Sequence, residues 1–240
     1  MRWVLALILV FATLPAYAAS CKSLKDFQTG LKVDLQIPAP VIDQSMTRRE
    51  LNKGEDARHK EWLKKNGMES VWSAGNLETA GLASGGSGLV FAFKLTGKAH
   101  DEYGFEVCPY FKTADVEMMY RTIISIPKEY PKDSCAYNVI ITHEMRHHNT
   151  NVTIVKNAVT RFQKDLPTII SAIENGVPYI DHRTAQSTGE NMKSQFEDAT
   201  HVYLNQTIMK AMEQENSKID SPEEYERSSK LLAECAAHSR

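Results

Sequence analysis

The sequence has no long block of charge of one sign. Its 240 residues include 28 Lys and Arg and 30 Asp and Glu, which gives a formal net charge of −2. A protein that holds nucleic acid through its phosphates needs a concentrated positive surface, so this balance argues against a nucleic-acid partner. The chain also lacks internal repeats, and 42% of its residues are hydrophobic and 24% charged. These values are typical of a globular protein and exclude wholesale disorder, a collagen-like fold and a coiled coil.

Long apolar runs are scarce, and the one present lies at the start of the chain. Arg2 is followed by an apolar stretch over residues 4–14 and then by Ala16-Tyr17-Ala18, the small-x-small pattern of a secretory cleavage site. The stretch is shorter than the roughly 20 residues that a spanning helix needs. We therefore predict a signal peptide over residues 1–19, export to the periplasm or the medium, and a single mature domain over residues 20–240 without a transmembrane segment.

Cysteine is rare as well, with four residues at Cys21, Cys108, Cys135 and Cys235. An even number of cysteines in an exported chain predicts two disulfides. Three pairings are open, and we favour Cys108–Cys135 with Cys21–Cys235, which would join the two mature ends. Because Cys21 directly follows the predicted signal, lipoprotein anchoring is a second, less favoured interpretation, since the usual Leu ahead of the cysteine is missing.

Strand and helix signals divide the chain into two halves. Short β-branched or aromatic runs predict strands at residues 31–37, 89–95, 104–107 and 122–126. Thr47 and Glu50 form a capping box that predicts a charged helix to Lys65, and the Gly- and Ser-rich residues 80–88 predict a turn-rich connector. From Ser134 onward the pattern is helical. We therefore expect an α+β fold with a mainly antiparallel sheet in the first half and helices in the second.

The most informative segment contains His143, Glu144 and His147 in the pattern H-E-x-x-H. Residues four apart on a helix lie about one turn, or roughly 6 Å, apart, so both imidazoles can reach one metal ion. The motif falls on a stripe that starts at Ile140 and continues with apolar residues, and polar groups on a core-facing stripe need partners. The spacing therefore predicts a metal site, with Glu144 placed to hold a water.

Two neighbours of the motif are less informative. His148 lies about 100° around the helix from His147, which favours a role at the surface or behind the ligands. Asn151 lies one turn beyond His147, where it could orient that imidazole or supply packing polarity alone.

Together, the motif, the strands before it, the signal and the cysteines resemble the zincin metalloproteases, and more narrowly the secreted bacterial zincin-like proteins. The resemblance is specific around His143 to His147 and architectural elsewhere. It implies a zincin-like fold, a Zn²⁺ cofactor and hydrolysis of peptide or protein substrates, in which Glu144 is the general base for a metal-activated water. In such proteins an edge strand holds the substrate, and residues 89–95 or 122–126 are the candidates here.

The third ligand departs from one branch of the family. A metzincin would have Gly and His where this chain has Thr150 and Thr153, which excludes that branch. A gluzincin-like site implies an acidic ligand from a later helix, and the resemblance then favours Glu197, followed by His201 and Asp198. Glu223 and Glu224 are poorer candidates because Ser221-Pro222 already explains them as the start of a helix.

Other interpretations stay open from the sequence. The protein could be a catalytically silent envelope or binding protein that keeps zinc for stability, or a metal-free partner-binding protein in which the motif is accidental. No spacing selects a residue that stabilises the oxyanion; the candidates are Tyr179, His182, Arg183 and Tyr203.

Overall fold

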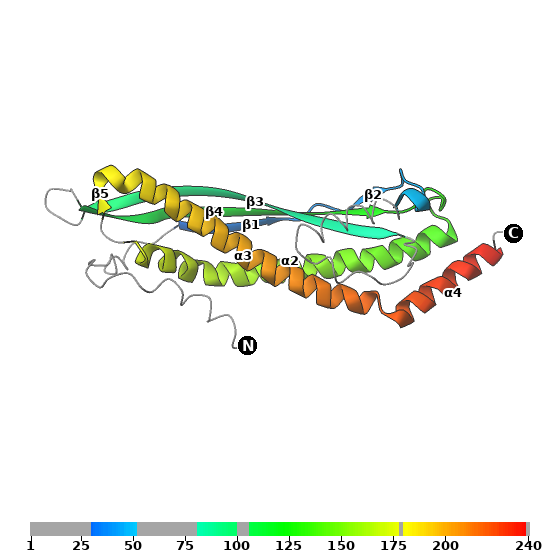
Figure 1. Ribbon diagram of the computed structural model, residues 1–240. Coiled ribbons are helices and arrows are strands. Elements are labelled where there is room, and N and C mark those ends of the chain that lie inside the picture. Colours follow the sequence, from blue (N-terminus) through cyan, green and yellow to red (C-terminus); the bar gives the residue numbers. More distant parts are fainter. Residues whose placement is uncertain (1–29, 52–80, 100–105, 178–179, 239–240) are drawn as a thin grey trace. The chain divides into compact units, whose positions relative to one another are not determined.

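The computed structural model describes residues 30–51, 81–99, 106–177 and 180–238. Along the chain (Figure 1) the elements are β1 (Gly30–Gln36), β2 (Val41–Asp43), β3 (Leu82–Ala99), β4 (Glu106–Ser125), α2 (Cys135–Asn175), β5 (Ile180–Asp181), a 3-10 turn (His182–Thr184), α3 (Ala185–Ile219) and α4 (Pro222–His238). The α+β class is confirmed. The expected signal peptide, Cys21 and most of the helix predicted to end at Lys65 lie outside the described residues.

Within the described residues the sheet has five strands and is built around the long strand β4, with which the other four pair. The ladder between β2 and β4 is parallel, with Val41 opposite Ile123, whereas the ladder between β4 and β5 is antiparallel, with Glu106 opposite Asp181. A parallel pair needs a long connection between its strands, and here β3 lies between β2 and β4 in the sequence. The expected mainly antiparallel sheet is therefore not confirmed.

The predicted connector at residues 80–88 is wrong for most of its length, because β3 begins at Leu82. β3 pairs with β4, and such pairing overrides the weak strand preference of Gly and Ser. The predicted strand at 89–95 lies inside β3, and residues 122–125 form the end of β4.

The structure divides into two compact units. The first contains the described residues within Met1–Lys32, Phe91–Val116 and Gln163–Val202, and the second those within Val33–Val90, Glu117–Phe162 and Tyr203–Arg240. In the first unit, Phe196 lies fully buried with ring contacts to Phe91 at 6.1 Å and to Phe111 at 5.7 Å. The H-E-x-x-H motif belongs to the second unit.

One core cluster of the second unit joins the end of β4 to the first turns of α2. It consists of Ile124, Ile126, Tyr137 and Ile140, and Leu232 of α4 packs against it. These contacts fix the face of α2 that carries the motif. None of the helices in the described ranges has both the length and the apolar character needed to cross a bilayer.

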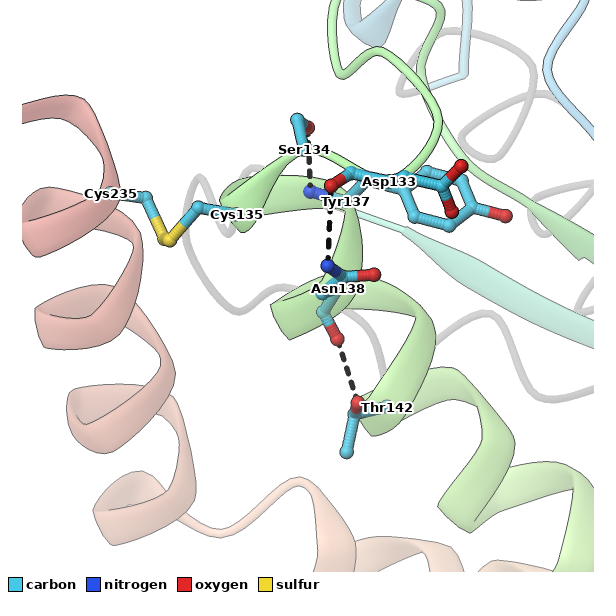
Figure 2. Close-up of a disulfide and its surroundings, with 7 residues drawn as sticks. All are labelled: Asp133, Ser134, Cys135, Tyr137, Asn138, Thr142 and Cys235. Carbon is cyan, nitrogen blue, oxygen red and sulfur yellow. Dashed lines mark hydrogen bonds between the residues drawn. A yellow bond between two sulfur atoms is a disulfide. The ribbon is translucent and has the colours of Figure 1, made fainter. Parts of the chain in front are cut away.

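Two helix starts follow the expected chemistry. Thr47 and Glu50 form the predicted capping box: the Glu50 amide donates to Thr47 Oγ1 at 3.1 Å, and the Thr47 amide donates to Glu50 Oε2 at 2.7 Å. At the start of α2, Ser134 is the N-cap and its Oγ accepts from the Tyr137 amide at 3.2 Å (Figure 2). The Ser134 cap therefore fixes the residue at which α2, the helix that carries the motif, begins.

The favoured disulfide pairing is wrong. Cys135, in the first turn of α2, is bonded to Cys235 of α4 with a Cα–Cα distance of 5.4 Å (Figure 2). Cys108 is also disulfide-bonded, and Cys21 lies outside the described residues. The pairing arises because α4 packs beside the first turns of α2, a contact that spacing along the chain does not encode.

Candidate metal centre

The two motif histidines lie one turn apart on α2, as the sequence predicts. Their rings meet edge to face with centroids 4.9 Å apart, and their Nε2 atoms are 3.2 Å apart. His147 is buried and His143 is half-buried. The two Nε2 atoms therefore point into the same small region.

Asp220 completes the cluster. It lies in the break between Ile219, where α3 ends, and Pro222, where α4 begins. Its Oδ1 is 3.0 Å from His147 Nε2 and 3.3 Å from His143 Nε2. The three atoms offered by His143, His147 and Asp220 all lie within 4.8 Å of one another.

The chemistry of these donors fits zinc. Two imidazole nitrogens and one carboxylate oxygen form a set found in catalytic zinc sites, which leaves one coordination position for water or substrate. His147 Nδ1 is 3.0 Å from Asn216 Oδ1, an atom that can only accept a hydrogen bond. Nδ1 therefore carries a hydrogen, and Nε2 is the nitrogen that faces the cluster and would bind a metal.

The electrostatics of the cluster favour bound positive charge. Burial tends to raise the pKa of Asp220, but hydrogen bonds from His143 and His147 outweigh it and lower that pKa to about 2. Burial tends to lower the pKa of His147, but Asp220, Asn216 and the charge of Glu144 outweigh it, so that this pKa is raised. Without metal the site holds protons, and a divalent cation would replace them.

Glu144 is next to the cluster and is not one of its ligands. Its side chain is buried, and its carboxylate accepts a hydrogen bond from the backbone N–H of Ala83 at the start of β3. Burial raises the pKa of Glu144, while the two histidines oppose that rise. A raised pKa makes the carboxylate a stronger base, which suits a general base.

Gly81 lies directly against Glu144. A Cβ atom at this position would come within 2.9 Å of Glu144 Oε1 and 2.5 Å of Ile140 Cγ2. Only glycine therefore permits the chain to approach so closely, and the entry to β3 holds one oxygen of the glutamate in place.

The third ligand expected from the sequence is not in this cluster. Glu197, Asp198 and His201 lie on the part of α3 that belongs to the first unit, and the cluster found among the described residues contains none of them. The ring of His201 contacts Phe91 at 5.5 Å. Asp220 takes the place expected for Glu197.

Asp220 was missed although the sequence carries a signal for it. It directly precedes Ser221-Pro222, which is confirmed as the start of α4, so it had to lie in the break between two helices. The acids weighed from the sequence were Glu197 and Asp198 before this break and Glu223 and Glu224 after the cap, but not the acid in the break itself. Of the two acids after the cap, Glu224 pairs with Arg146 of α2 at 2.6 Å, and this ion pair holds the break near the motif.

The remaining candidates have other surroundings. His148 is buried with its Nδ1 3.0 Å from Thr122 Oγ1, so it ties α2 to β4 and a surface role is wrong. Arg183 is exposed and pairs with Asp181 at 2.6 Å, and Tyr203 packs on Phe162 with ring centroids 5.6 Å apart. Tyr179 lies outside the described residues. None of these contacts selects an oxyanion-stabilising residue.

Comparisons with models of protein families, with curated proteins and with solved structures give no match. The functional interpretation therefore rests on the residues and their geometry.

Proposed function

We propose that the protein is an exported zinc-dependent metallopeptidase with His143, His147 and Asp220 as zinc ligands and Glu144 as general base. The observation that carries this proposal is the convergence of three ligand atoms within 4.8 Å, beside the buried Glu144 that directly follows His143 on α2. The zincin resemblance of the H-E-x-x-H motif supports the same reaction.

Each group has a defined part in the reaction. When bound, zinc acidifies water toward neutrality and polarises the carbonyl of a peptide substrate. Glu144 takes the proton of the attacking water and passes it to the leaving amine, and its raised pKa suits both transfers. The N–H of Ala83 holds the glutamate so that its carboxylate stays oriented while the proton moves.

The ligand set is tested by elemental analysis of the purified full chain. Alanine substitution of His143, His147 or Asp220 should each remove most bound zinc, because two remaining ligands hold the ion poorly. Glu197→Gln is the matched control and should keep full occupancy, because Glu197 is not in the cluster. Full zinc content in Asp220→Ala together with loss in Glu197→Gln would restore the sequence-based assignment of the third ligand.

The reaction is tested with Glu144→Gln on a peptide library. This variant should bind as much zinc as the wild type and lose hydrolysis by at least about 100-fold, since general-base catalysis typically contributes 10²–10⁴-fold. Equal hydrolysis by both proteins would refute the role of Glu144.

A silent zinc-stabilised binding protein is the second candidate. The observation that favours it is the burial of Glu144. This residue is only 5% exposed, and Gly81 lies against its carboxylate. This alternative predicts full zinc occupancy and higher thermal stability with zinc, but no cleavage of any library peptide by the wild type.

A further inference from the structure

We propose that Asn216 and Asn151 act as positioning residues that fix the tautomer and orientation of His147 for zinc. This inference rests on the proposed zinc site. It concerns two asparagines that the H-E-x-x-H motif does not include, one on α3 and one on α2.

The side chains form a continuous chain of hydrogen bonds behind the ligand. His147 Nδ1 is 3.0 Å from Asn216 Oδ1, and Asn216 Nδ2 donates to Asn151 Oδ1 at 3.1 Å. Asn151 is buried one turn after His147 on α2. Asn216 also reaches a second ligand through the backbone, because its carbonyl oxygen accepts from the Asp220 amide at 2.9 Å.

The direction of these bonds determines where the proton of the imidazole lies. An amide oxygen only accepts, so His147 Nδ1 must carry a hydrogen, and Nε2, which faces the Asp220 carboxylate, is the nitrogen that zinc would bind in place of a proton. The Asn216 amide is held in this orientation because its NH₂ group donates to Asn151 Oδ1. With its amide turned over, Asn216 would place its NH₂ group against Nδ1–H and its oxygen against Asn151 Oδ1.

The other motif histidine has no such support in the described part of the chain. His143 Nδ1 is buried and makes no hydrogen bond there. The side chains of the asparagine pair therefore act on one of the two histidine ligands, and their removal should weaken zinc binding through His147.

The test measures zinc affinity of the full chain by competition with a chromogenic chelator. Asn216→Ala should weaken binding about 10- to 100-fold, the usual effect of losing a partner behind a histidine ligand. Asn216→Asp should restore wild-type affinity or exceed it, because a carboxylate oxygen also accepts from Nδ1 and the Asn151 amide can turn to donate. Asn151→Ala should weaken binding less than Asn216→Ala. Asn205→Ala, an exposed asparagine on the same helix, should change nothing.

A second readout uses nitrogen-15 spectra of the metal-free protein, which separate protonated from unprotonated ring nitrogens. Above the pH at which His147 loses its second proton, the wild type should keep the hydrogen on Nδ1, and Asn216→Ala should show mixed tautomers. Equal zinc affinity in wild type and Asn216→Ala, or failure of Asn216→Asp to restore it in folded protein, overturns the inference. If the wild type binds no zinc, the proposed function fails, and the spectra then decide the tautomer role: an unchanged His147 pattern in Asn216→Ala rejects it, and mixed tautomers support it.

Discussion

The pKa values of His147 and Asp220 are shifted in the folded protein, so the stability of the metal-free protein should depend on pH. The folded pKa of Asp220 lies at about 2 against its ordinary 3.8, so its stabilising effect is present above pH 3.8 and is lost as pH falls toward 2. The folded pKa of His147 is raised above its ordinary 6.5, so its effect is complete below pH 6.5 and is lost as pH rises through the raised value. Between pH 3.8 and pH 6.5 both of these effects are complete.

This prediction is checked by thermal unfolding of chelator-treated protein from pH 2 to pH 9. The acid loss from Asp220 should amount to about 1–2 kcal/mol, after allowance for a side chain that is 36% exposed. His147→Gln should reduce the alkaline loss, and part should remain because burial also raises the pKa of Glu144. An alkaline loss of the same size in this variant would contradict the assignment.

Residue by residue, the predictable part of the site is the local part. His143, Glu144 and His147 are brought together by a single helical turn, so spacing alone places them. Asp220 follows His147 by 73 residues, and Cys235 follows Cys135 by 100. Contacts of this separation depend on how helices pack, and no periodicity in the chain encodes that packing.

At the scale of secondary-structure elements, the start of β3 controls Glu144, and Gly81→Ala tests this. The new methyl group would need space occupied by Ile140 Cγ2 and Glu144 Oε1, so the strand or the helix must move. We expect a loss of about 1–3 kcal/mol in stability, as for other overpacked sites, and lower hydrolysis at unchanged zinc content. Urea unfolding and a peptide assay measure both.

The matched control for this substitution is Gly189→Ala on α3. Its nearest neighbour would be Leu95 Cδ1 at 3.5 Å, an ordinary contact, and alanine is the better helix former by about 0.5–1 kcal/mol. The control should therefore be neutral or slightly stabilising. If both substitutions have the same effect, β3 does not restrain Glu144.

Elements with local signals were predictable, and elements made by pairing were not. The capping box at Thr47 and the start of α4 at Ser221-Pro222 depend on bonds within one turn. Residues 82–88 have a composition typical of loops, yet they form a strand because β4 is their partner. The parallel alignment of β2 with β4 is likewise decided by contacts distant in sequence.

At the scale of the whole molecule, the Cys135–Cys235 disulfide encloses the complete candidate site within one covalent loop. His143, His147 and Asp220 all lie between the two cysteines in the sequence. The bond fixes α4 to the first turn of α2 (Figure 2). The Arg146–Glu224 ion pair makes a second connection between the same helices. Since Asp220 lies two residues before α4, the bond should help to keep this ligand beside the histidines.

Replacing Cys135 and Cys235 together with serine should therefore reduce both stability and zinc affinity. The loop entropy of a crosslink over 100 residues suggests a loss on the order of 3–5 kcal/mol in metal-free protein. Zinc at 100 times its dissociation constant should return about 2.7 kcal/mol, because only the folded chain has the assembled site. Calorimetric unfolding with and without zinc measures both effects.

A double variant that is less stable but binds zinc as tightly as the wild type would show that Arg146 and Glu224 suffice to hold Asp220. The proposed coupling between the disulfide and the metal centre would then be wrong.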